Sequence, residues 1–351
     1  MTRAATVGPK TLGAVVFLVS VCMTPISLVE PIVKATGEGT LLWMLLAGGF
    51  SLLGGCLNLL LIEAPLVAWA DRLRDWMRYP RVLFYATGSA TMLNIWLNIL
   101  SGSELPSTPR LVLALLTLAV TAYALRMGVE TVTRLVGLIG VIVAPIVFGL
   151  ALLALTNAQL GPLLPHPLGT GQIPWIWPTI LFAPRGYDIL PAFGPLARPL
   201  QWRPVYVGLA LASAVLLLSI VTPILVFGYA ATLRFAFPYL SAVSTYTSQF
   251  LPFQRIGFLS FIAWQMIAFA ITTAYAMAAL VSLHAQVHPL TPWTAVTAIV
   301  LVVLALSLYL MPADISILEK NIWSTYGILL FCLSPGILLA AGRRRRQAVP
   351  A

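Results

Sequence analysis

Long apolar runs, separated by short polar segments, dominate the pattern along the chain. Ten runs each approach the roughly 20 residues that a helix needs to cross the hydrocarbon core of a bilayer. They lie at about 11–35, 39–62, 82–101, 109–125, 131–155, 174–195, 204–228, 256–286, 292–310 and 322–341. A lipid-exposed backbone must satisfy its own hydrogen bonds, and the alternation of a membrane barrel is absent. The pattern therefore predicts ten transmembrane helices.

Composition and charge strengthen this interpretation. Hydrophobic residues make up 60% of the 351 residues and charged residues 9%, against about 25% charged in soluble proteins. The formal net charge is +10, but the cations are scattered between apolar runs and cluster only at 343–346. A basic cluster beside a span is typical of a topology signal or of contact with anionic lipid. These features exclude a soluble globule and a nucleic-acid-binding domain.

The positions of the cations also predict the orientation. If the N-terminus lies in the cytosol, 14 of the 20 Lys and Arg fall in cytosolic segments and 5 in outer segments. Such an excess of cytosolic cations is the usual bias in membrane proteins. We therefore expect both termini in the cytosol, one membrane domain over 1–351, and a basic cytosolic tail at 342–351.

Two of the predicted spans are interrupted by helix-breaking and charged residues. The first contains Pro25, and the sixth contains Pro178, Pro184 and Pro191 together with the run Arg185–Asp188. Proline removes a backbone donor and clashes with the preceding turn. A charged residue in mid-span is expensive unless it faces a cavity or a partner.

The interrupted spans are the first and the sixth, so they occupy corresponding places in two halves of five. The halves would cover about 11–155 and 174–341. This arrangement is typical of an all-α, 5+5 inverted-repeat (LeuT-like) transporter fold, in which two broken helices meet at a mid-membrane binding site. Proline kinks are also common in ordinary membrane helices, and that interpretation stays open.

Arg185 and Asp188 are the leading candidates for ligand contact. Arginine suits a carboxylate because its planar fork donates two parallel hydrogen bonds. Asp188 or Glu30 would then meet an ammonium group. The alternative is a structural ion pair that holds the break in place.

Polar and aromatic residues in the two interrupted spans and in their neighbours complete the candidate ligand site. They are Thr24, Ser27, Asn94, Asn98, Phe182, Gly186, Tyr187, Thr272 and Tyr275. Each has a plainer role: hydroxyls can replace backbone bonds lost at a proline, amides can bind a neighbouring helix, and rings can simply pack.

Other polar groups have simpler explanations. His284 and His288 have a metal-like spacing without a third ligand nearby, so we expect no metal and no cofactor. The charged segment at 71–81 is expected to be a solvated cytosolic loop or a partner contact. Glu130 and Arg134 are one helical turn apart and should form a surface pair. No HExxH or GxSxG motif lies on a span, which argues against an enzyme.

Several motifs, in order along the chain, carry a resemblance to one family. They are Leu105-Pro106-Ser107-Thr108-Pro109, Tyr123, Gly128-Val129-Glu130 with Arg134, Leu164-Pro165 with Gly169, Gly186-Tyr187-Asp188 with Leu190-Pro191, and Arg255 before Trp264. This series resembles the B subunits of GerA-type spore germination receptors. Asp188 stands where the family usually has Glu, and Gln254 stands where an acid is expected.

The resemblance implies a ten-helix protein of the amino acid–polyamine–organocation superfamily in the inner spore membrane. Such a subunit binds a small germinant, commonly an amino acid, and works with a membrane A subunit and a lipoprotein C subunit. The leading hypothesis is therefore a germinant sensor. An ion-coupled secondary amino acid transporter is the alternative, because one scaffold hosts both functions.

Overall fold

The chain folds into a bundle that is almost entirely helical. The computed structural model describes residues 6–21, 28–64, 68–158, 173–235, 237–245, 257–283, 292–309 and 317–347. The α-helices are α1 (Pro9–Val21), α2 (Val29–Thr36), α3 (Thr40–Glu63), α4 (Ala68–Trp76), α5 (Arg78–Ile99), α6 (Arg110–Arg126), α7 (Val129–Ala154), α8 (Ile173–Leu181), α9 (Leu190–Phe193), α10 (Trp202–Phe227), α11 (Tyr229–Thr232), α12 (Pro238–Ser244), α13 (Gly257–Leu283), α14 (Trp293–Tyr309), α15 (Ile317–Ile328) and α16 (Ser334–Gln347).

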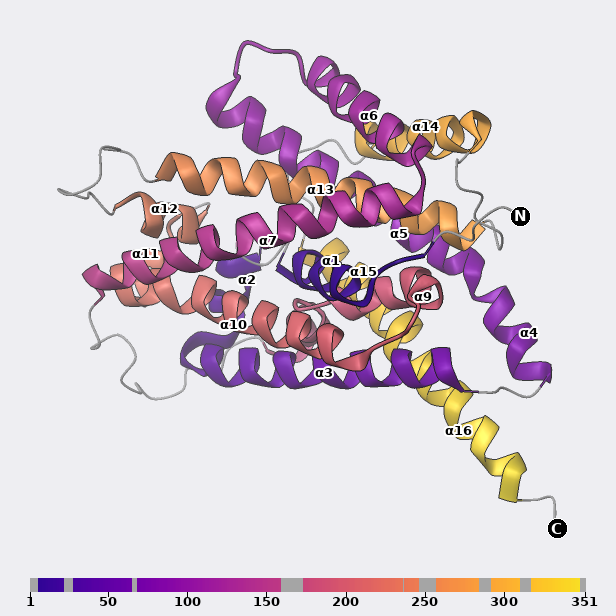
Figure 1. Ribbon diagram of the computed structural model, residues 1–351. Coiled ribbons are helices and arrows are strands. Elements are labelled where there is room, and N and C mark those ends of the chain that lie inside the picture. Colours follow the sequence, from indigo (N-terminus) through magenta and orange to yellow (C-terminus); the bar gives the residue numbers. More distant parts are fainter. Residues whose placement is uncertain are drawn as a thin grey trace.

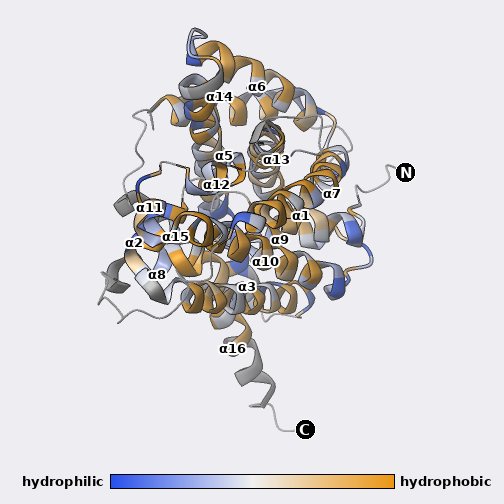
Figure 2. Ribbon diagram, turned by 90° about the vertical axis from the view of Figure 1, so that its left-hand side faces the viewer, coloured by the Kyte–Doolittle hydropathy of each residue, from blue (hydrophilic) through white to orange (hydrophobic). Residues whose placement is uncertain are grey.

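The long helices run side by side (Figure 1). Figure 2 looks along most of them and places α1 near the middle of the bundle, with α3 at one edge and α6 and α14 at the other. The sequence explains the central position of α1, because its residues from Leu12 to Val21 are almost all apolar and nearly all buried.

A close helix crossing fixes α1 against α10. A methyl group added at Gly13 would lie 2.4 Å from the carbonyl oxygen of Pro204, and one added at Gly208 would lie 2.4 Å from the carbonyl oxygen of Gly13. Small residues at such a crossing let two backbones approach, which is the usual way membrane helices pack.

The outer surface is apolar where a bilayer would touch it. Leucine and valine side chains on the outer faces of α3, α6 and α7 are more than half exposed, among them Leu42, Leu116 and Val141. Among the described residues, five helices are long and apolar enough to cross a membrane; they lie within Thr40–Glu63, Val129–Asn157, Trp202–Phe227, Leu259–Leu283 and Asn321–Ala340. Shorter apolar helices occupy Pro9–Val21 and Trp293–Leu308. The protein is therefore an integral membrane protein, as the apolar runs predicted.

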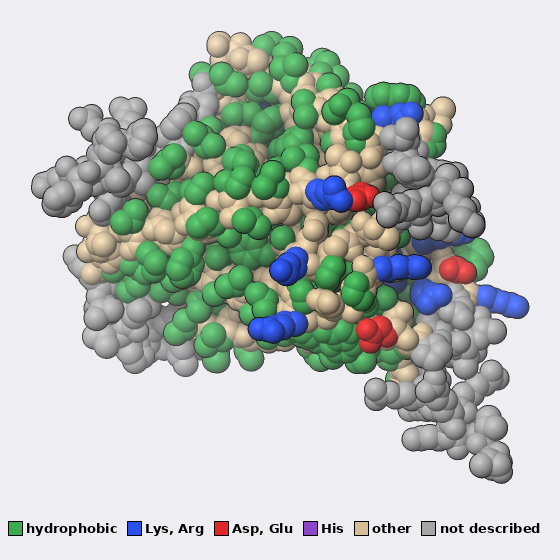
Figure 3. Space-filling view, viewed as in Figure 1, with side chains coloured by type: hydrophobic (Ala, Val, Ile, Leu, Met, Phe, Trp, Pro, Cys, Tyr) green, Lys and Arg blue, Asp and Glu red, His purple; other side chains and the backbone are tan. Residues whose placement is uncertain are grey.

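Charged side chains are unevenly placed on the surface. On the face seen in Figure 3, Lys and Arg lie from the middle of the helices to their right-hand end, and the described atoms at the left-hand end are hydrophobic or uncharged. The starts of α1, α7 and α10 lie towards the charged end (Figure 1).

The interruption predicted in the sixth span is present. Helix α8 ends at Leu181, a turn covers 182–184, and a short 3-10 turn over Gly186–Ile189 leads into α9. The corresponding prediction for the first span falls on 22–27, outside the described residues, between the end of α1 and the start of α2.

The charged segment at 71–81 is helical rather than a loop, because it contributes to α4 and to the first turn of α5. Arg72 and Asp75 are exposed, as expected of a solvated segment. Arg81 differs, because it is only 7% exposed and lines a cavity together with residues of α3, α9 and α13.

Candidate functional site

The interruption between α8 and α9 is held by hydrogen bonds from other helices. The hydroxyl of Ser51 on α3 donates to the carbonyl oxygen of Pro184 at 2.5 Å. The backbone N–H of Gly186 donates to Ser20 Oγ on α1 at 2.9 Å, and that hydroxyl donates to the Val16 carbonyl at 2.8 Å. Breaking a helix frees backbone groups that must find partners inside a membrane, and two serines provide them here.

Gly186 is required by the close approach of α1. A methyl group at this position would lie 1.9 Å from Ser20 Oγ and 2.2 Å from the Val16 carbonyl oxygen. Any side chain would therefore push α1 and the interruption apart. Glycine serves here by allowing contact between two backbones, which is one of the uses of this residue.

Asp188 lies at the centre of the interruption and is fully buried. Its Oδ2 accepts a hydrogen bond from the hydroxyl of Tyr275 at 2.7 Å, and its backbone carbonyl accepts one from the hydroxyl of Tyr85 at 2.6 Å. Its other carboxyl oxygen, Oδ1, is buried with no hydrogen-bond partner within the described residues. A buried polar atom without a partner is costly, so Oδ1 marks a place where a donor would be stabilising.

The guanidinium of Arg185 is 3% exposed and lies against aromatic rings. Its central carbon is 4.3 Å from the ring centroid of Trp323, 5.5 Å from that of Tyr275 and 6.0 Å from that of Phe182. Cation–π contact stabilises a desolvated arginine by about 2 kcal/mol or more.

Aromatic rings enclose this region on several sides. Phe84 stacks on Trp323 with centroids 4.5 Å apart and packs edge-on against Phe331 at 4.9 Å. Phe182 packs edge-on against Tyr187 at 5.9 Å. The charged groups therefore sit in a water-poor, apolar surrounding, where electrostatic interactions are strong.

The structure brings most of the predicted residues of the sixth and eighth spans together. Phe182, Arg185, Gly186, Tyr187 and Asp188 form the interruption, and Tyr275 binds it from α13. Thr272 lies one turn before Tyr275 and is buried, and its carbonyl accepts a hydrogen bond from Ser89. Thr272 thus belongs to the packing of α13 against α5.

Asn94 and Asn98 have a different partner. Both side-chain carbonyls accept hydrogen bonds from the guanidinium of Arg110, at the start of α6. Asn94 lies nine residues after Tyr85, about 13 Å farther along α5. The two amides therefore join α5 to α6 at a distance from the interruption.

Other predicted residues lie outside the described residues. They are Thr24, Ser27, His284 and His288. Among the described residues, no group of three or more His, Cys, Asp or Glu is placed to hold a metal ion.

Sequence reasoning missed several residues that hold the interruption. Ser20 and Ser51 bind its backbone, Tyr85 binds the Asp188 carbonyl, and Trp323 covers Arg185. A polar side chain in the middle of an apolar span was the available signal for both serines. The ring partners gave no such signal, because aromatic residues make up 10% of the chain and are spread over many of its segments.

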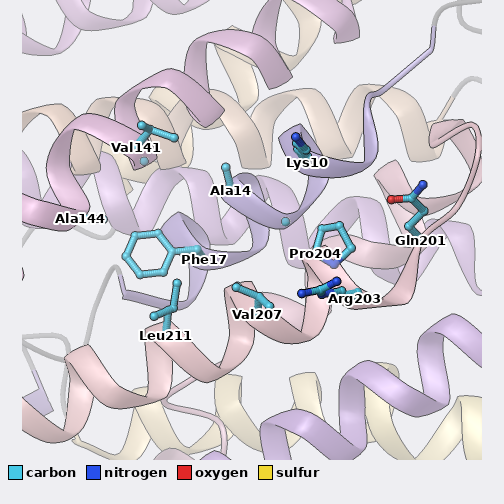
Figure 4. A pocket seen from close by; sticks show the side chains of 13 residues that line it. Lys10, Ala14, Phe17, Val141, Ala144, Gln201, Arg203, Pro204, Val207 and Leu211 are labelled. Carbon is cyan, nitrogen blue, oxygen red and sulfur yellow. The ribbon is translucent and has the colours of Figure 1, made fainter.

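A separate groove lies between α1, α7 and α10 (Figure 4). Its volume is about 500 Å³ and its lining is mainly apolar, with Lys10 and Arg203 among the lining residues. None of the residues that surround Arg185 and Asp188 lines this groove. It is therefore distinct from the interruption.

Comparisons with known proteins identify one family model that matches most of the chain. A family model described as "spore germination protein" matches residues 81–316. A search of the curated proteins finds no match. A solved structure of a Na+-coupled sialic acid symporter, in a substrate-bound outward-open state, is 12% identical. That comparison covers 98% of this chain and 75% of the symporter, with a TM-score of 0.49.

Proposed function

We infer, since the chain belongs to the spore germination protein family, that this integral membrane protein is the germinant-sensing subunit of a spore germination receptor. The single observation that supports a binding role most strongly is the buried, charged interruption at Arg185–Asp188. Buried ionisable groups in a membrane are costly and are retained mostly for function. The proposed ligand is a small polar nutrient, most simply an amino acid.

The proposed topology has ten membrane crossings in one domain, with two repeats of five at about 11–155 and 174–341. Both termini lie in the cytosol of the spore, and the membrane is its inner membrane. The gathering of Lys and Arg at one end of the bundle supports this orientation (Figure 3).

Arg185 is proposed to bind the carboxylate of the ligand. Its guanidinium carbon lies 4.3 Å from the ring centroid of Trp323, so aromatic contacts hold the arginine in place. A carboxylate suits this side chain because the planar fork can donate two parallel hydrogen bonds.

Asp188 is proposed to bind the ammonium group. Tyr275 occupies Oδ2, while Oδ1 is a buried acceptor with no partner in the described part of the chain. An ammonium group at Oδ1 would satisfy this atom and balance the carboxylate charge. Phe182 and Tyr187 then form the apolar walls, and the backbone carbonyl of Gly186, whose N–H already donates to Ser20 Oγ, completes the contact.

The proposed function needs partner proteins and no catalysis. As the family resemblance implies, a membrane A subunit and a lipoprotein C subunit would relay ligand binding. The exposed apolar faces of the helices contact the lipid bilayer. We propose no enzymatic activity, no metal and no cofactor.

A thermal-shift screen of the purified full-length protein tests this proposal. A ligand that binds only the folded state raises the apparent melting temperature. Amino acids, sugars and nucleosides are screened, and any stabilising compound is titrated. We expect an amino acid to stabilise the protein, and Arg185→Gln and Asp188→Asn to weaken its binding by about 10- to 100-fold, the effect of losing a charged hydrogen bond.

Arg134→Gln is the matched control, because Arg134 pairs with Glu130 at 2.5 Å on an exposed helix face. This control should leave ligand binding unchanged. Equal binding by the wild type, Arg185→Gln and Asp188→Asn would contradict the proposed site. If the protein alone took up labelled amino acid into vesicles, driven by an ion gradient, it would be a transporter rather than a sensor.

A further inference from the structure

A second cavity, lined by several charged residues, lies at the charged end of the bundle. Its volume is about 510 Å³, and it is lined by residues of α3, α4, α5, α9 and α13. Arg74, Arg78 and Arg81 line it together with the carboxylate of Asp75. The lining therefore carries more positive than negative charge, which favours an anion.

Arg81 is the central observation, because it is buried and has free donors. Its side chain is 7% exposed, and its Nε and Nη2 have no hydrogen-bond partner among the described residues. The Nε of Arg78 is also buried without a hydrogen-bond partner among the described residues. A buried guanidinium without partners is expensive, and an oxyanion between the two arginines would satisfy these donors with charge-assisted bonds.

An unpaired acceptor in the same cavity further restricts the chemical class of the ligand. The amide nitrogen of Asn58 donates to the carbonyls of Gly54 at 2.8 Å and Phe331 at 2.7 Å. These two bonds fix the orientation of the amide, and its Oδ1 is buried without a partner in the described region. A ligand that carries both anionic oxygens and one hydroxyl donor would satisfy Arg81 and Asn58 together.

We propose that this cavity is a binding site for a small oxyanion that also carries a hydroxyl group, of the hydrogen phosphate or hydroxycarboxylate class, held by Arg81 and Arg78 with Asn58 as hydrogen-bond acceptor. The site is separate from the interruption, although Pro191 and Ala192 of α9 line it. The inference does not depend on the proposed germinant role, because it follows from the unpaired groups of the cavity alone.

Titration of the purified full-length protein with inorganic phosphate tests the proposal. Binding is followed by thermal shift and calorimetry in phosphate-free buffer, with chloride keeping the ionic strength constant. Malate, a dicarboxylate that carries a hydroxyl donor, is titrated in a second series, to distinguish a phosphate from a hydroxycarboxylate. We expect saturable binding of at least one of the two probes, weakened about tenfold or more by Arg81→Gln and by Arg78→Gln, with Arg81→Lys intermediate because it keeps charge but loses the fork.

Arg134→Gln again provides the control, since it removes one positive charge from an exposed pair elsewhere on α7. It should bind the probe as the wild type does. Arg78→Gln, at a less buried position, keeps the test decisive if Arg81→Gln does not fold. The proposal is overturned if neither probe binds beyond the chloride background, or if both arginine variants bind the probe with wild-type affinity.

Discussion

Two buried arginines have opposite surroundings in this protein. Arg185 lies on a broken helix, and the rings of Trp323, Tyr275 and Phe182 cover it. Arg81 lies in the first turn of an unbroken helix and faces a cavity of about 510 Å³ with two of its nitrogens unpaired. The protein itself stabilises the first guanidinium, whereas the second has little protein support.

The difference shows how burial of a charge indicates function. A buried charge that the protein supports can be structural, and only an unpaired neighbour such as Asp188 Oδ1 points to a ligand. A buried charge without support points to a missing partner more directly. Stability measurements should therefore separate the two regions, since loss of contacts at the interruption is costly and loss of Arg81 is not.

The largest effect is expected at Gly186. In Gly186→Ala, the new methyl group would meet Ser20 Oγ at 1.9 Å and the Val16 carbonyl oxygen at 2.2 Å. We expect a loss of about 3 kcal/mol or more, the upper range for overpacking, seen as a lower yield of monodisperse protein and a lower melting temperature. Gly149→Ala is the control, because nothing lies within 4 Å of its added methyl group. Similar losses in both variants would show that α1 does not press on the interruption.

The serines that bind the interruption should have the next largest effects. Ser20→Ala and Ser51→Ala each leave a buried backbone group of the interruption unpaired, at a cost of about 1–3 kcal/mol. Ser213→Ala is the control, because its hydroxyl donates to the Leu209 carbonyl within the same helix. We expect its loss of stability to be a few tenths of the loss in Ser20→Ala or Ser51→Ala. Melting temperatures of the three variants measure the difference, and equal values would contradict the role of the two serines.

Replacement of Arg81 should change the stability only slightly, and should raise it rather than lower it. In phosphate-free buffer we expect Arg81→Gln to be as stable as the wild type or about 1 kcal/mol more stable, because a desolvated and unpaired charge is removed. Arg185→Gln should instead lose stability with its cation–π contacts. If Arg81→Gln were less stable than Arg185→Gln, this would contradict the claim that the protein stabilises the guanidinium of Arg185 more than that of Arg81.

The smallest effect is expected at the surface pair. Arg134→Gln breaks an exposed bond to Glu130 one turn away on α7, where the two side chains are 73% and 44% exposed. Such pairs contribute at most a few tenths of a kcal/mol, and salt weakens them further. The free energy of unfolding derived from melting curves should therefore match that of the wild type within about 0.5 kcal/mol, at low and at high salt.

Much of the fold could be predicted from the apolar runs. The lengths of the runs predicted the long helices, and the prolines around Arg185 predicted the interruption that the structure contains. The spacing of Glu130 and Arg134 also predicted their pair, which is present. These features depend on local sequence, so they could be inferred without knowing which helices are neighbours.

The partners of each side chain could not be predicted, because they come from distant helices. Asn94 and Asn98 share a helix face as expected, yet their partner is Arg110 rather than the interruption. Arg81 looked solvent-exposed because its neighbours in the sequence are charged, whereas it is 7% exposed and lines a cavity with residues of α3, α9 and α13. Tertiary packing, which sequence periodicity does not encode, decided both cases.

The most direct test of the central claim is an experimental structure of the protein with its stabilising amino acid bound. The account predicts the ligand carboxylate within hydrogen-bond distance of the edge of Arg185 and the ammonium group at Asp188 Oδ1. A ligand found elsewhere, for example in the groove between α1, α7 and α10, with Arg185 and Asp188 still bound only to protein groups, would contradict it.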